Sequence, residues 1–349
     1  MKRRTIIGIA AATFGSAALA ALPAASLLPR AAAAAGSIVF TSWGGTTQEA
    51  QKTAWARPYT KASGVRVQMD GPTDYGKFKA MVESGNVGWD VVDVEYDFAA
   101  QAARDGLLEP IDFSLVKREA LDPRFVTDHA VGSFYYAFVL GYGTKHVPAA
   151  PKSWADLFDT KAFPGKRTFY KWSAPGALEI ALLADGVAPD KLYPLDLDRA
   201  FAKLDSIKSE IIWWSGGAQS QQLLASGEVV MGQFWNGRVA ALEQDRQPVG
   251  IAWEQNLTTA DMLVVPKGSR NRQAAMTFIA AATGAKEQAD FAAATRYAPI
   301  NLGSAKLMDP AVAETLPNRH AATQINLNME YWAKNREEIG KRWYAWQTR

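Results

Sequence analysis

The chain has 349 residues, enough for about two domains, and 48% of them are hydrophobic, as in a globular protein. It contains three histidines, twelve tryptophans and no cysteine. The lack of cysteine excludes disulfide bonds, thiolate nucleophiles, cysteine-ligated metals and a lipid anchor on cysteine.

Residues 1–35 have the pattern of an export signal, which we expect to be cleaved. They begin with three basic residues, continue with an apolar stretch free of acidic residues and end in an alanine run over 31–35. Arg3 and Arg4 also fit a twin-arginine pattern loosely, so the general secretory and twin-arginine routes both stay open. An uncleaved membrane anchor over 6–28 is the alternative, and the alanine run favours cleavage.

Removal of this signal changes the charge balance of the chain. The signal holds four of the 38 basic residues and no acidic residue, so 34 basic and 35 acidic residues remain, a net charge of −1. Such a balance gives no reason to expect nucleic acid or an anionic membrane surface as a partner.

Short strands and helices alternate along the rest of the chain, as in an α/β protein. In the first part this alternation predicts a parallel sheet covered on both faces. There we expect strands over 37–42, 65–69, 89–94 and 133–141, and helices over 46–61, 75–83 and 99–104. The segment 153–210 has a mainly helical pattern apart from a strand over 166–170. Further strands are expected over 211–214, 229–235, 249–253 and 262–265, with helices over 219–225, 239–244, 273–282, 286–293 and 322–346.

The sequence contains none of several common catalytic or cofactor-binding motifs. His129, His146 and His320 lie far apart and share no metal-ligand spacing. No G-x-S-x-G, G-x-x-x-x-G-K-[ST] or G-x-G-x-x-G motif occurs. We therefore predict no catalytic residue, no metal site and no cofactor, and a secreted enzyme of unknown type is the weaker hypothesis.

Two polar clusters have plain structural interpretations. Asp93, Glu95 and Asp97 would share one face of a strand, and a solvated edge is favoured there over a metal cage. Tyr135 and Tyr136 could resemble a ferric-ion site, but core packing within an aromatic strand is favoured.

Several tryptophans follow predicted strands directly, at the turn into a helix. Trp43 precedes a Gly-Gly pair, Trp213 and Trp214 precede Ser-Gly-Gly, and Trp235 precedes Asn-Gly. Ligand contacts of α/β sheets gather at the carboxyl ends of strands. Together these indole rings predict a box of flat apolar walls that suits alkyl chains and can hold cations.

Seven segments in a fixed order resemble the periplasmic solute-binding proteins of ABC importers, in the spermidine/putrescine-binding family and its GABA-binding subgroup. The resemblance spans nearly the whole chain after the signal. Its markers are SWGG at 42–45, WDVVD at 89–93, GLLEPID at 106–112, SWADLF at 153–158, GEV through WNG at 227–237, DMLVVP at 261–266 and YAPIN at 297–301.

The resemblance implies a type II periplasmic binding protein, in which two α/β lobes are joined by crossover strands and close over a ligand cleft. Lobe 1 would contain 36–141 plus 262–301, and lobe 2 would contain 142–261 plus 302–349. It also implies a monomer that delivers a small-molecule ligand to a membrane permease.

The resemblance further assigns ligand contacts to Trp43, Trp235, Asp261 and Tyr297. In polyamine binders, the aspartate that corresponds to Asp261 grips an ammonium group. Their second acidic cluster belongs near 173–176, where this sequence has no acidic residue before Glu179. That difference weighs against a polyamine.

Arg238 predicts an anion in the same site. It starts a helix beside Trp235, although a helix N-terminus disfavours a cation, and a bound carboxylate would explain its position. With Asp261 at the other end, the pair predicts a zwitterionic ω-amino acid such as GABA.

A polyamine and an aminophosphonate stay open as alternative ligands. Gly45 and Thr46 begin a helix whose N–H groups could hold a second anion. Trp213 and Ser173, and with them Trp172, are further candidates for the cleft wall.

Overall fold

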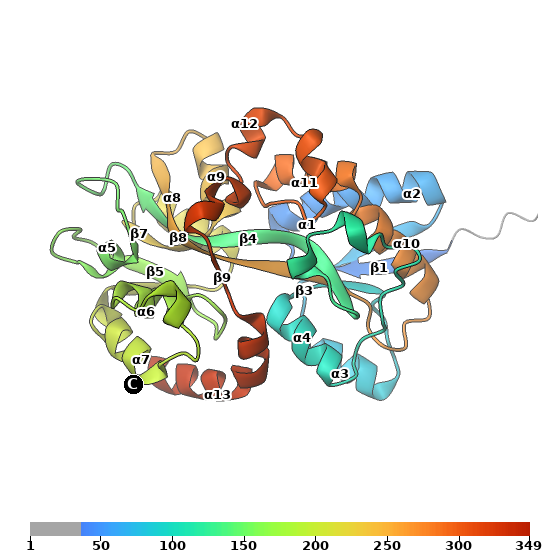
Figure 1. The fold of residues 1–349 in the computed structure, drawn as a ribbon, viewed down its shortest axis with the longest axis horizontal. Helices are drawn as coiled ribbons and strands as arrows, with labels where there is room; N and C mark the ends of the chain where they lie inside the picture. The colour runs from blue at the N-terminus through green and yellow to red at the C-terminus, as the bar shows by residue number, and fades with distance from the viewer. Residues whose placement is uncertain (1–35) are drawn as a thin grey trace, which may run out of the picture. The chain divides into compact units, whose positions relative to one another are not determined.

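The computed structural model describes residues 36–349, and the predicted export signal lies outside the described residues. One mixed sheet of nine strands runs through this part of the chain in the order β2-β1-β3-β8-β4-β7-β5-β6, with β9 beside β8 (Figure 1). Its strands are β1 (Ser37–Thr41), β2 (Arg66–Asp70), β3 (Val91–Glu95), β4 (Ala130–Gly143), β5 (Arg167–Tyr170), β6 (Ile211–Trp214), β7 (Met231–Trp235), β8 (Val249–Val264) and β9 (Ile325–Asn326).

Three parallel strands form one end of the sheet, as the alternating pattern predicts. β1 pairs with β2 on one side and with β3 on the other. After β1 comes α1 (Gly45–Gln51), which continues through a π-helical turn over 52–56 into α2 (Arg57–Ser63). The other two connecting helices are α3 (Tyr75–Ser84) and α4 (Tyr96–Arg104). These elements confirm the three strands and three helices expected there.

Two long antiparallel strands, β4 and β8, form the middle of the sheet. They pair along most of their length, and β8 also pairs with β3 while β4 pairs with β7. The prediction of separate strands over 249–253 and 262–265 is wrong, because residues 257–261 pair with β4 and the residues between Ala252 and Leu257 form a bulge within one continuous strand. A register shift near Phe138 absorbs the left-handed backbone of Gln255, whose φ is 55°.

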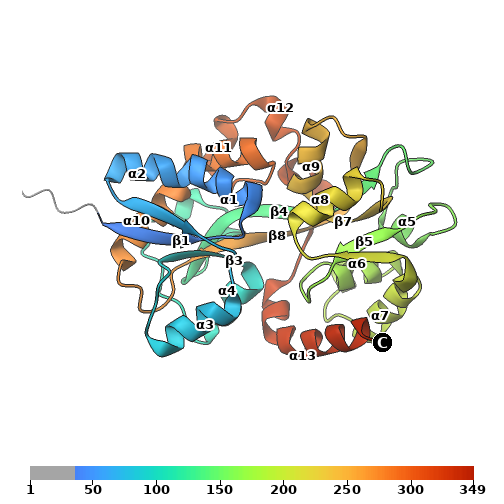
Figure 2. The same ribbon diagram turned by 180° about the vertical axis from the view of Figure 1, so that it is seen from behind.

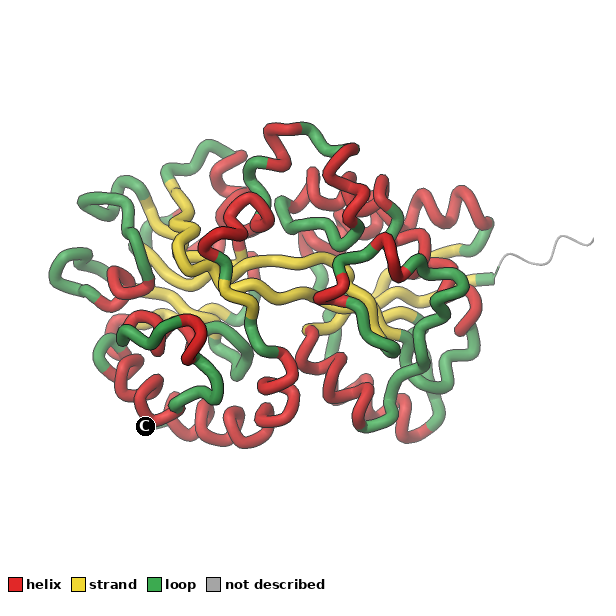
Figure 3. Tube along the Cα trace, viewed as in Figure 1, coloured by secondary structure: helices red, strands yellow, loops and turns green. Residues whose placement is uncertain are grey.

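The remaining helices cover both faces of the sheet (Figures 2 and 3). They are α5 (Trp154–Phe158), α6 (Ala177–Ala184), α7 (Leu197–Asp205), α8 (Gly217–Ala225), α9 (Asn236–Gln244), α10 (Arg272–Ala282), α11 (Ala285–Thr295), α12 (Pro310–Ala313) and α13 (Met329–Gln347). Within residues 36–349, no helix has the length and apolar character needed to cross a membrane.

Two helical expectations need correction. The segment 153–210 holds three short helices and long connections rather than mainly helix. The last helix begins at Met329 and not near 322, because Asn328 accepts a hydrogen bond from the backbone N–H of Tyr331 and caps it there. Residues 325–326 before it pair with β8 as β9.

A fully buried arginine holds the chain around β5. Arg167 donates hydrogen bonds to the carbonyl oxygens of Leu157 at 2.9 Å, Gly165 at 2.6 Å and Asp159 at 3.1 Å. The carbonyls of Leu157 and Gly165 accept no backbone hydrogen bond among the described residues, whereas the Asp159 carbonyl also accepts from the N–H of Phe163 at 3.0 Å.

We expect Arg167→Met to lower the free energy of unfolding by about 2–4 kcal/mol, because it leaves the Leu157 and Gly165 carbonyls unpaired in the interior. Chemical denaturation monitored by tryptophan fluorescence measures the loss. Arg66→Met, at an exposed arginine of the edge strand β2, is the matched control and should change it by less than about 0.5 kcal/mol. Equal stability of the two variants would contradict this role of Arg167.

Candidate functional site

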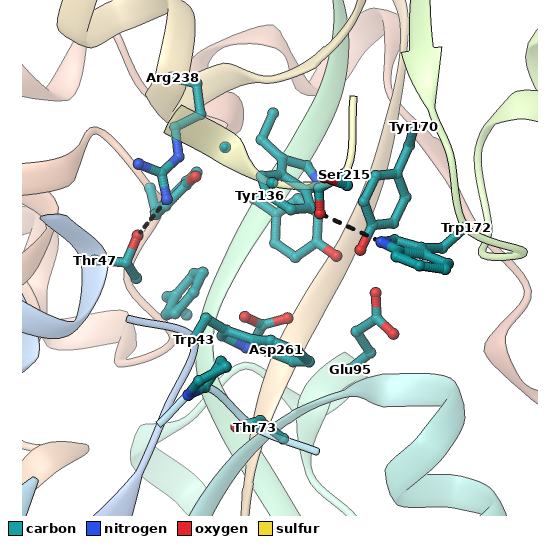
Figure 4. A pocket seen from close by; sticks show the side chains of 16 residues that line it. Trp43, Thr47, Thr73, Glu95, Tyr136, Tyr170, Trp172, Ser215, Arg238 and Asp261 are labelled. Carbon is teal, nitrogen blue, oxygen red and sulfur yellow. Dashed lines mark hydrogen bonds between the residues drawn. The ribbon is translucent and has the colours of Figure 1, made fainter. Parts of the chain in front are cut away.

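A cavity of about 390 Å³ lies against the long strands β4 and β8, at the carboxyl ends of β1, β3, β5, β6 and β7 (Figure 4). Strand ends, helix starts and the loops between them all contribute to its wall, as expected for an α/β ligand site. The lining residues are Trp43, Thr47, Pro72, Thr73, Glu95, Phe134, Tyr136, Tyr170, Trp172, Ser215, Gly216, Gly217, Trp235, Arg238, Asp261 and Tyr297.

Arg238 lies on the first turn of α9, where the sequence places it, and its guanidinium faces the cavity. Its Nη1 donates to Thr46 Oγ1 at 2.8 Å and its Nη2 to Thr47 Oγ1 at 3.2 Å. Its Nε is buried and has no hydrogen-bond partner among the described residues. A guanidinium with one buried N–H unused is equipped to take an acceptor from a ligand.

Two close backbone approaches shape the surroundings of Arg238. A Cβ on Gly217 would lie 2.3 Å from Arg238 Nε, so only glycine leaves room for the guanidinium in this position. A Cβ on Gly237 would lie 2.6 Å from the carbonyl oxygen of Thr295. Asn236 fixes the start of α9 further, because its side chain accepts from the N–H of Ala137 at 3.0 Å and donates to the carbonyl of Arg296 at 2.7 Å.

Asp261 supplies a carboxylate to another part of the cavity wall. It lies on β8 between Glu95 of β3 and Phe134 of β4, and Glu95 also lines the cavity. Burial raises the pKa of Asp261 well above its ordinary value, and the nearby Asp93 and Glu95 carboxylates raise it further. The indole N–H of Trp43 lowers this pKa in part, although it makes no hydrogen bond of standard geometry.

Aromatic rings form most of the remaining wall. Phe134 and Tyr297 stack with their centroids 4.9 Å apart, and Tyr136 meets Trp235 edge-on at 6.2 Å. The Tyr170 ring is tilted against that of Trp235, with the centroids 5.4 Å apart. Packed rings of this kind hold each other in fixed orientations and give the cavity a continuous apolar wall.

Six of the ten residues that the sequence analysis proposes for the ligand site line this cavity, and four do not. The six are Arg238, Asp261, Trp43, Trp235, Tyr297 and Trp172. Thr46 does not line the cavity but accepts a hydrogen bond from Arg238 through its hydroxyl oxygen. Gly45, the first residue of α1, does not line the cavity either.

Trp213 and Ser173 lie away from the cavity. The Trp213 ring packs edge-on against Trp343 and Trp346 of α13, because side chains on β6 alternate between faces. Ser173 is buried, and its backbone N–H donates to the Tyr344 hydroxyl at 3.4 Å. Trp172, the other candidate of this segment, lines the cavity and is exposed.

Sequence reasoning missed several lining residues. Phe134 and Tyr136 share one face of β4, and their spacing of two was the available signal. The sequence favours core packing for Tyr136, and burial does raise its pKa well above the ordinary value, but its ring also forms the cavity wall.

The interpretation of Asp93, Glu95 and Asp97 as a solvated edge is wrong. β3 ends at Glu95 and α4 begins at Tyr96, so the three residues do not continue one strand. Asp93 is fully buried and accepts from Gln51 Nε2 at 2.5 Å, and Asp97 is buried against Arg336. No group of three or more His, Asp or Glu within 36–349 has the arrangement of a metal site.

The fold and the site define the class of this protein. A mixed sheet with two long central strands and an aromatic cavity at strand ends is the architecture of type II periplasmic binding proteins, and solved structures of that class match it. Residues 54–319 match the family of bacterial extracellular solute-binding proteins. The chain belongs to this family.

Individual relatives support the same membership. Over 324 residues, 90% of this chain and 91% of the relative, it is 36% identical to the gamma-aminobutyric acid-binding protein of Pseudomonas aeruginosa. Over 80% of this chain and 83% of the relative, it is 25% identical to spermidine/putrescine-binding periplasmic protein 1 of Haemophilus influenzae.

Two solved structures are similar in both sequence and fold. The Atu4243-GABA receptor is 65% identical, with a TM-score of 0.87 over 89% of this chain and 98% of that chain. The binding protein AgtB of Agrobacterium tumefaciens R10, solved with agropinic acid, is 36% identical, with a TM-score of 0.82 over 90% of this chain and 99% of that chain.

Family membership confirms the prediction of a solute-binding protein rather than an enzyme. Proteins of this family bind small molecules outside the bacterial cytoplasm and work with the permeases of ABC transporters.

The buried Asp93 beside this site should make stability depend on pH. Burial raises its pKa from 3.8 to about 7, against the opposing hydrogen bonds from Gln51, Ser133 and Ser42. The folded protein therefore keeps a proton that the unfolded chain releases, and stability falls as pH rises from about 4 to about 7.

We expect Asp93→Asn to raise the free energy of unfolding at pH 8 by about 2 kcal/mol more than at pH 5, because asparagine carries no charge to bury. Urea denaturation of both proteins at the two pH values measures this difference. Asp105→Asn, at an exposed carboxylate, should change the free energy of unfolding by the same small amount at both pH values. A pH-independent effect of Asp93→Asn would contradict the burial of a titrating carboxyl.

Proposed function

We propose that this protein captures a small zwitterionic ω-amino acid, with GABA as the leading ligand, and delivers it to an ABC permease. The observation that carries this proposal is the presence of one arginine with an unused buried N–H and one buried carboxylate in the same aromatic cavity. The names of the 36% identical binding protein and of the 65% identical receptor support the same ligand.

The anion end of the proposed ligand lies at Arg238. A ligand carboxylate there would accept from Arg238 Nε, the guanidinium N–H that lacks a protein acceptor. Thr46 and Thr47 hold the other two guanidinium nitrogens, so the fork is oriented before the ligand arrives. Pre-organisation of this kind lowers the entropy cost of binding.

The cation end lies at Asp261 and Glu95. A ligand ammonium there would be attracted by both carboxylates and by the faces of neighbouring aromatic rings. The methylenes between the two ends would contact the aromatic wall, whose rings exclude water from the chain of the ligand.

A polyamine is the second candidate, because two carboxylates line the cavity and the 25% identical relative is a spermidine/putrescine-binding protein. Arg238 weighs against it. A diamine would bring its second ammonium toward the guanidinium and leave Arg238 Nε unpaired, and an uncompensated buried charge costs several kcal/mol.

The proposal extends to compartment and assembly. Residues 1–35 would be cleaved on export to the periplasm, and the mature protein would act as a monomer without nucleic acid. The lobes would be 36–141 plus 262–301 and 142–261 plus 302–349, with closure by bending of β4 and β8, the two long strands that cross between them.

We expect Arg238→Ala to weaken GABA binding by at least about 3 kcal/mol, roughly a hundredfold in Kd, because the ligand carboxylate loses its partner. Isothermal titration calorimetry measures the change. Arg57→Ala, which removes an exposed arginine on α2, is the matched control and should bind as the wild type does.

A thermal-shift panel of GABA, β-alanine, 5-aminovalerate, putrescine and spermidine tests the ligand class directly. An ω-amino acid should give the largest stabilisation. A larger shift with putrescine than with every ω-amino acid would overturn the choice of ligand, and an unchanged Kd of Arg238→Ala would remove Arg238 from the site.

Binding should release protons and weaken as pH falls. Because the pKa of Asp261 is raised by burial and by the neighbouring carboxylates, this group takes up a proton more readily than an ordinary aspartate, and only the ionised carboxylate pairs with an ammonium group. GABA affinity should therefore fall as pH is lowered through this pKa. Calorimetry in buffers of different ionisation enthalpy measures the released protons. Asp261→Asn should bind more weakly and release fewer protons, and equal release from both proteins would contradict this role.

A further inference from the structure

The C-terminal helix α13 is fastened to one part of the molecule by three indole N–H groups. Trp332 Nε1 donates to Glu179 Oε1 at 2.6 Å, Trp343 Nε1 to the carbonyl of Lys171 at 2.9 Å, and Trp346 Nε1 to Asp205 Oδ1 at 2.7 Å. All three acceptors lie within 142–261, so α13 is bound to the second of the proposed lobes.

Arg336 of the same helix reaches to the other proposed lobe. Its Nη1 is paired with Asp97 Oδ2, and its Nη2 lies 3.7 Å from Glu95 Oε2. Its guanidinium carbon lies 5.5 Å from the ring centroid of Tyr75. Both ribbon views place α13 beside α4, the helix that carries Asp97 (Figures 1 and 2). The Asp97 side chain is only 1% exposed and its Oδ1 has no partner among the described residues, so Arg336 is its principal compensation.

The partners of Arg336 continue to the cavity. Glu95 lines it directly. The Tyr75 hydroxyl donates to Glu95 Oε2 at 3.1 Å and accepts from the Glu95 backbone N–H at 3.1 Å. The Tyr75 ring also meets Trp43 edge-on at 6.0 Å, and Trp43 is part of the cavity wall. A continuous set of contacts therefore joins α13 to the proposed ammonium end.

We propose that Arg336 is a positioning residue that fastens α13 to the cavity wall when the lobes close over ligand. The inference rests on the proposed function, because it assumes closure. Contacts from Arg336 to Asp97 and Glu95 exist in the closed arrangement, and water replaces them when the lobes separate. A contact made in one state only shifts the equilibrium toward that state, and a ligand held by the closed state then dissociates more slowly.

Arg336→Gln tests the proposal by stopped-flow fluorescence with GABA as the probe. We expect Kd to rise about tenfold, mainly through faster dissociation, with a smaller change in association rate. Arg336→Lys should recover only part of the loss, because an ammonium group cannot span two carboxylates as a guanidinium fork does.

The same helix offers a matched control. Arg342 is paired with Asp198 of α7, and both residues lie in the second proposed lobe. Arg342→Gln removes a surface ion pair of the same type without touching the contact between the lobes. GABA dissociation from this variant should equal that of the wild type.

Closure can be measured directly because the chain has no native cysteine. Spin labels on Glu83→Cys in α3 and Lys191→Cys, both at exposed positions, report the distance between the proposed lobes. GABA should shorten this distance in the wild type, and Arg336→Gln should reduce the closed fraction at a given occupancy.

The outcomes separate the two hypotheses. A wild type that neither binds an ω-amino acid nor closes would refute the proposed function. A wild type that binds and closes, beside an Arg336→Gln variant with unchanged dissociation, would refute the fastening role alone. A variant that loses as much free energy of unfolding without GABA as with it would also refute that role, because Arg336 would then stabilise every state equally.

Discussion

The pairing of β8 with β3 and β4 is the constraint on which the site depends. It places Asp261 between Glu95 and Phe134, three residues that are far apart in the sequence. Because these backbone hydrogen bonds fix the register, a slip of one residue would turn Asp261 to the opposite face. The position of Asp261 in the cavity is thus a consequence of strand register, whereas the position of Arg238 depends on the start of α9.

Arg238 and Asp261 have different neighbours, and these neighbours affect the two buried charges in different ways. Arg238 has two of its nitrogens satisfied by threonine hydroxyls, which orient the guanidinium without neutralising it. Asp261 has other carboxylates as neighbours, which together with burial raise its pKa and so disfavour its ionised form. A zwitterion would compensate both charges together, since each end of the ligand supplies the charge that the protein lacks there.

Residue patterns predicted the parallel strands, the place of Arg238 in the first turn of a helix and the aromatic strand ends, because these follow from local preferences and from periodicity. They did not predict that 249–264 is one strand, since the strand continues through the pairing of 249–252 and 257–264 with β4 on both sides of the bulge and not through the sequence of the bulge itself. Glu95 was misplaced for a similar reason. Its neighbourhood depends on where β3 ends and on Arg336, which lies 241 residues further along the chain.

The distribution of tryptophans illustrates how tertiary context decides function. Trp43 and Trp235 form the cavity wall, whereas Trp332, Trp343 and Trp346 use their indole N–H groups to hold α13. All five are large aromatic residues, so composition alone could not distinguish the tryptophans of the cavity wall from those that hold α13 in place. What separates them is the partner of the nitrogen. The indole N–H groups of Trp43 and Trp235 have no hydrogen-bond partner of standard geometry among the described residues, whereas those of the three tryptophans of α13 each have one.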